Sequence, residues 1–209
     1  MYPEKPLIIV TTSHRPTQRV RSFVKDLVSV LPRAVRLTRG KATLRDLYYE
    51  AMGLGARRVV VVSTWKGNPG TIHVYEPLEP PEEGLREILS LRLSGVKLSR
   101  ERPEAQRSYG ARVLGVLSPP PGPLAGLADS LVRALMARLV LAEDTPGVDV
   151  VARIEPGGPG HVAVIDFVCT GSQRPCGPLL RVASVVDHVS GFRLHRALRP
   201  PQEAPRGTG

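Results

Sequence analysis

The spacing of apolar residues in the first third of the chain predicts strands that alternate with helices. A continuous apolar run at 7–10 is typical of a strand buried on both faces. Apolar side chains at helical spacing follow it, and Pro32 ends that helix. This interleaving predicts βαβ units and a mostly parallel sheet. The predicted elements are strands at 7–10, 34–37 and 58–63 and helices at 17–31 and 43–54.

The rest of the chain predicts a second α/β half. A strand, a serine, prolines and a helix follow one another at 111–142, the same order as at 7–31, which indicates an internal duplication. The predicted elements are a turn at 67–70, a connection at 76–84, a helix at 124–142, and strands at 71–76, 91–98, 111–117, 148–155, 161–170 and 179–189.

These elements predict an α/β fold with mixed sheets flanked by helices. We expect one domain over 1–198 built from two structurally similar halves, about 1–98 and about 110–198. A chain of 209 residues buries enough surface to fold without a metal or disulfide. Residues 199–209 contain nothing to bury and are expected to form a flexible tail.

Composition bears on the cellular location of the protein and on whether it holds a metal or a cofactor. No segment reaches the roughly 18 uninterrupted apolar residues of a membrane span, and no signal peptide is evident, so we expect a cytoplasmic protein with no membrane contact. Cys169 and Cys176 have no neighbouring histidine or second cysteine pair, so we expect buried thiols rather than a metal site. No cofactor is expected.

Charge points to the class of partner. The chain has 29 Lys and Arg against 19 Asp and Glu, a net charge of +10. Residues 1–66 hold 13 of these cations and only 4 acids, whereas the remaining 143 residues hold 16 and 15. Twenty-four of the cations are arginine, whose planar fork matches phosphate oxygens. A basic excess of this kind favours a polyanion such as nucleic acid.

The basic residues follow the carboxyl ends of the first three predicted strands, where ligands bind in open α/β sheets. Segments 13–15, 38–41 and 64–66 would share one edge if these strands are parallel, and the first helix begins there with its free amides. Trp65 either stacks on an unpaired base or closes a hairpin against the core. The candidate RNA-binding residues are Ser13, Arg15, Arg19, Arg36, Arg39, Lys41, Arg45, Trp65 and Lys66.

The chain lacks the common enzymatic motifs. It has no phosphate-binding loop, no dinucleotide fingerprint, no nucleophile elbow, and its five histidines are scattered along the sequence. We therefore predict no catalytic residues and no enzymatic activity.

Four blocks of sequence resemble the Brix domain family of ribosome biogenesis proteins. They are TTSHRPTQRVRSFVKDL (11–27), RLTRGK (36–41), VVVVSTWKGNPGTIHVY (59–75) and CGPLLRVASVVDHV (176–189). The short chain is similar to the single-domain archaeal members. The resemblance implies two α/β halves, each similar to the anticodon-binding domains of some aminoacyl-tRNA synthetases, and rRNA binding without catalysis.

Two positions depart from the family pattern. His14 stands where Arg is frequent, and Leu179 follows Gly177 and Pro178 where Arg is common. The second departure weakens any transfer of RNA contact to the C-terminal block.

The leading hypothesis is a non-catalytic rRNA-binding factor that acts on pre-rRNA during ribosome biogenesis, with other ribosome assembly proteins as candidate partners. Two alternatives stay open. One is a module that reads tRNA or an anticodon stem. The other is a scaffold whose basic surface binds an acidic protein.

Overall fold

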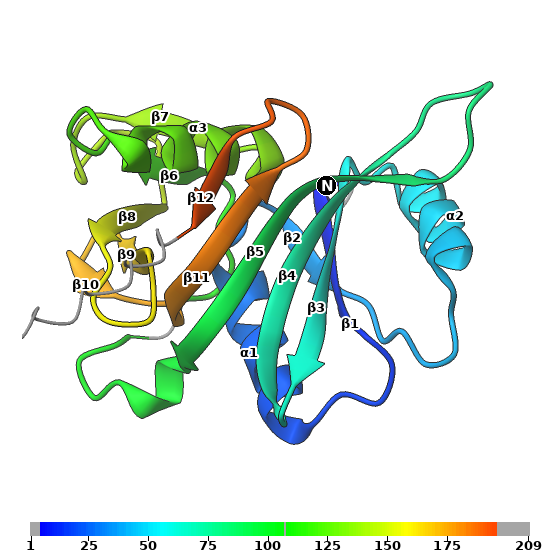
Figure 1. Cartoon of the computed structure of the whole chain (residues 1–209), viewed down its shortest axis with the longest axis horizontal. Helices are drawn as coiled ribbons and strands as arrows, with labels where there is room; N and C mark the ends of the chain where they lie inside the picture. The colour runs from blue at the N-terminus through cyan, green and yellow to red at the C-terminus, as the bar shows by residue number, and fades with distance from the viewer. Residues whose placement is uncertain (1–4, 107, 196–209) are drawn as a thin grey trace, which may run out of the picture.

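The computed structural model describes residues 5–106 and 108–195. Within these residues the chain forms three α-helices, one 3₁₀ turn and twelve strands (Figure 1). In chain order they are β1 Ile8–Thr12, α1 Gln18–Val30, β2 Ala34–Arg36, α2 Leu44–Leu54, β3 Arg58–Trp65, β4 Asn68–Pro77, β5 Leu85–Lys97, η1 Ser99–Glu101, β6 Leu114–Leu117, α3 Pro123–Leu135, β7 Arg138–Val140, β8 Val150–Pro156, β9 Ala163–Cys169, β10 Arg174–Pro175, β11 Leu179–Asp187 and β12 Arg193–His195.

The described strands belong to one mixed sheet, in the order β2-β1-β3-β4-β5-β11-β9-β8-β6-β7, with β10 on β9 and β12 on β11. β1 is parallel to β2 and β3, and β6 is parallel to β7 and β8, whereas the other pairs are antiparallel. The α/β class with a mixed sheet is therefore confirmed. The expectation of more than one mixed sheet is wrong, because β5 pairs with β11 and joins the strands of both halves into one sheet.

The strand order of the second half mirrors that of the first about the β5–β11 pair. A likeness of each half to anticodon-binding domains stays a prediction, as do the bounds of the domain. The tail predicted at 199–209 lies outside the described residues.

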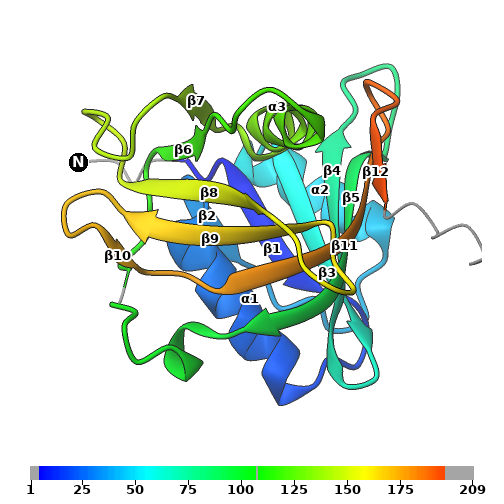
Figure 2. The ribbon, with the colours of Figure 1, turned by 60° about the vertical axis from the view of Figure 1, so that its left-hand side comes forward.

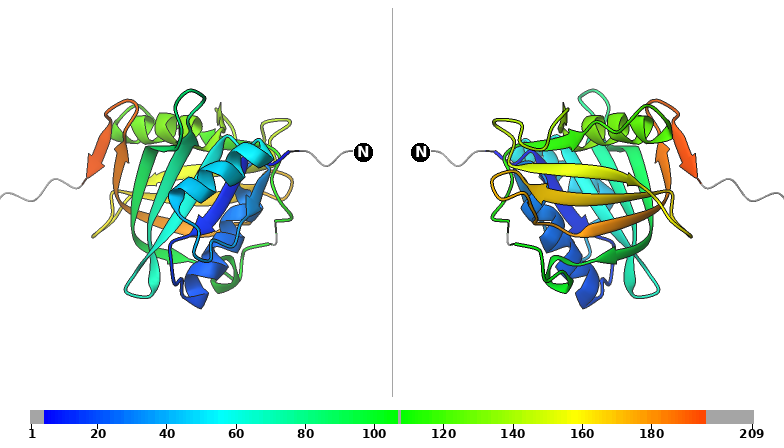
Figure 3. Two further views of the ribbon diagram at one scale, coloured as in Figure 1. Left: turned by 90° about the vertical axis from the view of Figure 1, so that its right-hand side faces the viewer. Right: turned by 90° about the vertical axis from the view of Figure 1, so that its left-hand side faces the viewer.

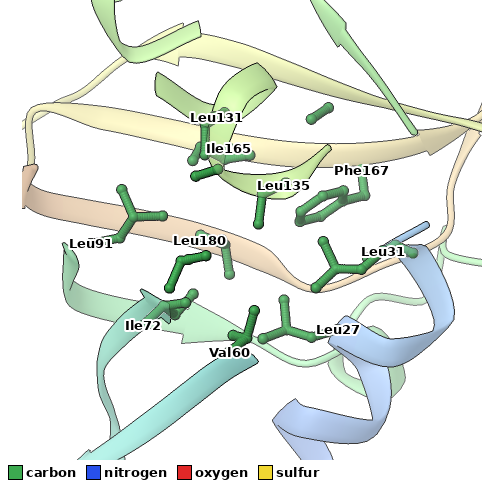
Figure 4. Close-up of a cluster of buried hydrophobic side chains, with 14 of the residues drawn as sticks. Leu27, Leu31, Val60, Ile72, Leu91, Leu131, Leu135, Ile165, Phe167 and Leu180 are labelled. Carbon is green, nitrogen blue, oxygen red and sulfur yellow. The ribbon is translucent and has the colours of Figure 1, made fainter. Parts of the chain in front are cut away.

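One large core serves both halves. Helices α1 and α3 pack on the same face of the sheet, which is strongly bent, so that β8 and β9 run across the direction of β3 and β4 (Figures 2 and 3). Leu27 of α1, Leu131 of α3, Leu91 of β5 and Leu180 of β11 belong to the same buried cluster (Figure 4). Because α3 also contacts β4 and β5, the second half completes the core of the first.

Helix α2 covers the opposite face of β1 and β3 (Figure 3). Its buried residues Leu47 and Ala51 pack against Ile9, Val59 and Val61. The neighbouring residues of the same two strands face the large core. Strands β1 and β3 are thus buried on both faces, as their continuous apolar runs predicted.

Several predicted boundaries are wrong. The helix expected over 124–142 ends at Leu135, because Met136 adopts a left-handed conformation with φ of 55°. The apolar residues beyond it form β7, which pairs with β6. Strand β5 begins at Leu85 rather than 91, since its first residues pair with the end of β4. The short strands β10 and β12 were not predicted.

The two cysteines form a disulfide, so the expectation of buried thiols is wrong. Strand β10 folds back on β9 and pairs Arg174 with Cys169, which brings the Cα atoms of Cys169 and Cys176 to 5.7 Å. That separation lies within the range that a disulfide spans. No metal-binding group of three His, Cys, Asp or Glu residues occurs within the described residues. No helix within 5–106 or 108–195 is long and apolar enough to cross a membrane.

Asp187, at the end of β11, anchors α3 to the sheet. Burial alone would raise the pKa of its carboxyl group, but hydrogen bonds from Ser190, Arg133, Ser130 and Val189 outweigh burial and hold that pKa well below its usual range. The Arg133 guanidinium donates over 2.5 Å and the Ser130 hydroxyl over 2.8 Å. Arg133 is therefore a structural residue, although its side chain is 40% exposed.

We predict that Leu180→Ala destabilises the whole domain. Leu180 is 2% exposed and lies where β11 meets β5, so the cavity is expected to cost about 2–5 kcal/mol. Denaturation followed by tryptophan fluorescence, which reports on β3, and by far-ultraviolet circular dichroism should give coincident transitions. The control is Leu139→Ala, because Leu139 is 49% exposed. Separate transitions for the two probes, or an equal loss in the control, would contradict a shared core.

Candidate nucleic-acid interface

The first three strands are parallel, which is the condition for the basic segments to share one edge of the sheet. β1 lies between β2 and β3 and runs parallel to both, with Val10 opposite Arg36 and Thr12 opposite Val62. The loops that follow their carboxyl ends therefore meet at one edge of the sheet. Helix α1 begins at the same edge, beside the β3–β4 hairpin (Figure 1). The predicted convergence of these loops is confirmed.

Four arginines line a hollow of about 440 Å³ at this edge. Arg15 comes from the loop after β1, Arg36 and Arg39 come from the end of β2 and its loop, and Arg21 comes from the second turn of α1. Ser13, Thr38 and Gly40 complete its polar rim. We call the hollow lined by Arg15, Arg21, Arg36 and Arg39 the basic hollow.

Side-chain hydrogen bonds hold the loops around the basic hollow. The Thr11 hydroxyl donates to the Leu37 carbonyl over 2.8 Å, and Nδ1 of His14 lies 3.3 Å from the Gly40 carbonyl oxygen. Nε of Arg39 donates to the Ala42 carbonyl over 2.9 Å. These contacts fix the loop after β1 against the loop after β2, so their cations are presented together.

The start of α1 adds to the positive potential. Thr17 is the N-cap, its hydroxyl oxygen accepting from the Val20 amide over 3.3 Å, and the first turn carries no acidic side chain. The positive end of the helix dipole is therefore uncompensated near Arg15, which favours an anion. Arg15 and Lys66 also have left-handed backbones, with φ of 53° and 47°. Such conformations are uncommon for residues other than glycine and concentrate at functional sites.

Trp65 and Lys66 lie beside the basic hollow, on the β3–β4 hairpin. The Thr17 hydroxyl donates to the Gly67 carbonyl over 2.8 Å and ties the hairpin to α1. Trp65 is 64% exposed, and Nζ of Lys66 lies 5.9 Å from its ring centroid. The alternative that this indole closes the hairpin against the core is therefore wrong.

Five of the nine predicted residues do not line the basic hollow: Trp65 and Lys66 of the hairpin, and also Lys41, Arg45 and Arg19. Lys41 is exposed in the loop just beyond it. The Arg45 guanidinium lies on α2, where Nη2 donates to the Tyr49 hydroxyl over 3.1 Å and stands 3.7 Å from Glu83.

Arg19 turns to the opposite side of α1 and does not reach the basic hollow. Its guanidinium binds both carboxylate oxygens of Glu101, and Nη2 also donates to the Val96 carbonyl over 3.2 Å. Hydrogen bonding in this pair raises the pKa of Arg19 and lowers that of Glu101. Arg21, which is not among the predicted residues, lines the basic hollow instead of Arg19.

No protein-family model matches the chain. A curated protein of Aeropyrum pernix, named a probable Brix domain-containing ribosomal biogenesis protein, is 41% identical over 185 residues. The alignment covers 88% of this chain and 99% of that protein. The chain belongs to the Brix domain-containing family. A Brix domain-containing protein of Thermococcus kodakarensis is 44% identical over 95 residues, covering 46% of this chain and 44% of its own length.

Two solved structures share the fold of the chain. The crystal structure of a probable ribosomal biogenesis protein from Aeropyrum pernix K1 aligns with a TM-score of 0.74 at 39% identity, over 85% of this chain and 95% of that one. An archaeal Imp4-like protein aligns with a TM-score of 0.62 at 23% identity, over 86% and 99%, which supports the fold alone. The basic hollow thus belongs to the first half of a Brix domain.

We predict that Arg19 and Arg36 of this Brix domain differ in their effect on stability. Arg19→Ala removes a bidentate ion pair and a hydrogen bond to the backbone, so it should cost about 1 kcal/mol. Arg36→Ala should stay within about 0.5 kcal/mol, because the exposed Arg36 side chain makes no ion pair with any described acid. Chemical denaturation measures both. A larger loss for Arg36→Ala than for Arg19→Ala would contradict this division.

Proposed function

We propose that this Brix domain is a non-catalytic RNA-binding factor in ribosome biogenesis. It contacts pre-rRNA phosphates through the basic hollow and the adjoining hairpin residue Lys66. Its relatives are named ribosomal biogenesis proteins, which supports the process. The RNA contact rests on the chemistry of the basic hollow.

The observation that carries this proposal is the contrast between two sets of arginines. Arg58, Arg102 and Arg153 are each bound to a carboxylate of the domain. None of the four arginines of the basic hollow forms an ion pair with a described acid. Cations that the fold does not neutralise remain available to an external anion, and guanidinium forks match phosphate oxygens two at a time.

The shape of the surface favours a phosphate backbone over one small anion. The basic hollow, the start of α1 and the hairpin lie side by side, joined through Thr17 and Gly67. A row of separate cations suits a polymer that carries a charge at each nucleotide. We therefore assign the basic hollow to the RNA backbone.

We predict that Arg21→Glu with Arg36→Glu weakens binding to pre-rRNA fragments by at least about tenfold, because two phosphate contacts become repulsive. With five contacts, from the four arginines of the basic hollow and from Lys66, the wild-type slope of log affinity against log salt should be about −3.5 for single-stranded RNA, and it should be markedly shallower for the variant. Filter binding at several salt concentrations measures both quantities.

The matched control is Arg138→Glu with Arg174→Glu, two exposed arginines of the second half that line no part of the basic hollow. Arg133 is unsuitable because it holds Asp187. An equal loss in the control pair would mean that binding follows net charge. Tighter binding of tRNA than of pre-rRNA would favour a tRNA-reading module, and wild-type protein without RNA affinity would favour an acidic protein partner.

A further inference from the structure

A second hollow, of about 390 Å³, lies between the β3–β4 hairpin and strands β5 and β11. Trp65 of β3, Thr71 of β4, Arg92 and Ser94 of β5, and Ala183 of β11 line it, together with Gly160 of the loop between β8 and β9. Both halves therefore build it. We call it the tryptophan hollow. In Figure 2 its strands β5 and β11 run side by side across the domain.

Thr71 of β4 and Arg92 of β5 point away from the core, whereas Leu93 of β5, which also lines the tryptophan hollow, is buried in the core. Thr71 precedes the buried Ile72, and Arg92 lies between the buried Leu91 and Leu93. Alternation along a strand therefore places Thr71 and Arg92 on the outer face, where they stand opposite each other in the β4–β5 register.

The indole of Trp65 lines one side of the tryptophan hollow. A Cβ atom at Gly70 would lie 2.7 Å from Cβ of Trp65 and 3.4 Å from the Ser63 hydroxyl oxygen, so only glycine allows the approach. Ser63 also bonds across the hairpin, its hydroxyl oxygen accepting from the Thr71 amide over 3.0 Å. The hairpin thus fixes the base of this side chain, and the ring is 64% exposed, with Nζ of Lys66 5.9 Å from its centroid. An exposed aromatic ring beside a cation can stack on an RNA base.

The polar groups of the hollow suit the rest of a nucleotide. Arg92 is exposed and forms no ion pair with any described acid, and no carboxylate lines the hollow. The Ser94 hydroxyl donates to the Arg181 carbonyl over 3.3 Å and retains its acceptor capacity. The Thr64 hydroxyl oxygen, also in the wall, is shielded from solvent and has no hydrogen-bond partner within the described residues.

We propose that the tryptophan hollow binds one unstacked nucleotide of single-stranded RNA, with the base on Trp65 and the phosphate on Arg92. The inference rests on the proposed function, because the strand would reach this hollow from the basic hollow over the hairpin that Thr17 holds. A duplex, whose bases are stacked and paired, leaves the tryptophan hollow unused. The domain therefore distinguishes single strands from duplexes by this hollow and holds both by the basic hollow.

The test measures binding of a single-stranded oligouridylate and of a duplex RNA of the same length. Trp65→Leu should weaken single-strand binding by about fivefold or more and leave duplex binding unchanged, and Trp65→Phe should recover part of the loss. Arg92→Ala should show the same selectivity. Since Trp65 is the only tryptophan of the chain, the oligouridylate should also quench the intrinsic tryptophan fluorescence.

The control is Tyr109→Leu, because Tyr109 is 91% exposed and lines neither hollow. Equal losses for single strand and duplex in Trp65→Leu, or no loss and no quenching, would overturn the nucleotide site. If Arg21→Glu with Arg36→Glu weakens both ligands while Trp65→Leu weakens neither, this inference fails and the proposed function stands. If wild-type protein binds neither ligand, both fail.

Discussion

The antiparallel pairing of β5 with β11 is the contact on which the rest of the domain depends. It runs from Leu179 opposite Lys97 to Asp187 opposite Leu89 and makes one sheet of strands that lie far apart in the sequence. Because α1 and α3 then share a face, neither half needs its own closed core. The same pairing places Arg92 beside β11, so the tryptophan hollow exists only when the two halves are joined.

The local pattern of apolar residues predicted most elements of the first half because residues that break helices mark where its helices end. Pro32 follows the end of α1, and the left-handed Gly55 ends α2. The second half has no such signal after α3, where apolar residues continue at helical spacing. The segment after α3 becomes a strand because β7 pairs with β6. A short stretch of sequence does not show this pairing, because the two strands lie more than 20 residues apart. The β5–β11 junction and the disulfide also depend on contacts between distant strands, so the sequence pattern did not reveal them.

The residues of the candidate site also fall into those that the sequence predicted and those that depend on contacts between distant residues. Ser13, Arg15, Arg36 and Arg39 were predictable because the carboxyl ends of parallel strands meet at one edge. Arg19 was misplaced because its direction depends on Glu101, which lies 82 residues along the chain. Arg21 and Arg92 were missed because charge counting cannot separate cations that the fold neutralises from cations that it leaves free. A search for arginines one helical turn from the basic loops would have found Arg21.

The most direct test is ultraviolet crosslinking of the protein to RNA in cells, followed by mass spectrometry of the crosslinked peptides. The account predicts pre-rRNA as the crosslinked RNA and adducts within residues 12–21, 36–41 and 65–71, where the basic hollow and the hairpin lie. Adducts confined to the segment from α3 to β8, or recovery of the protein without RNA, would contradict it.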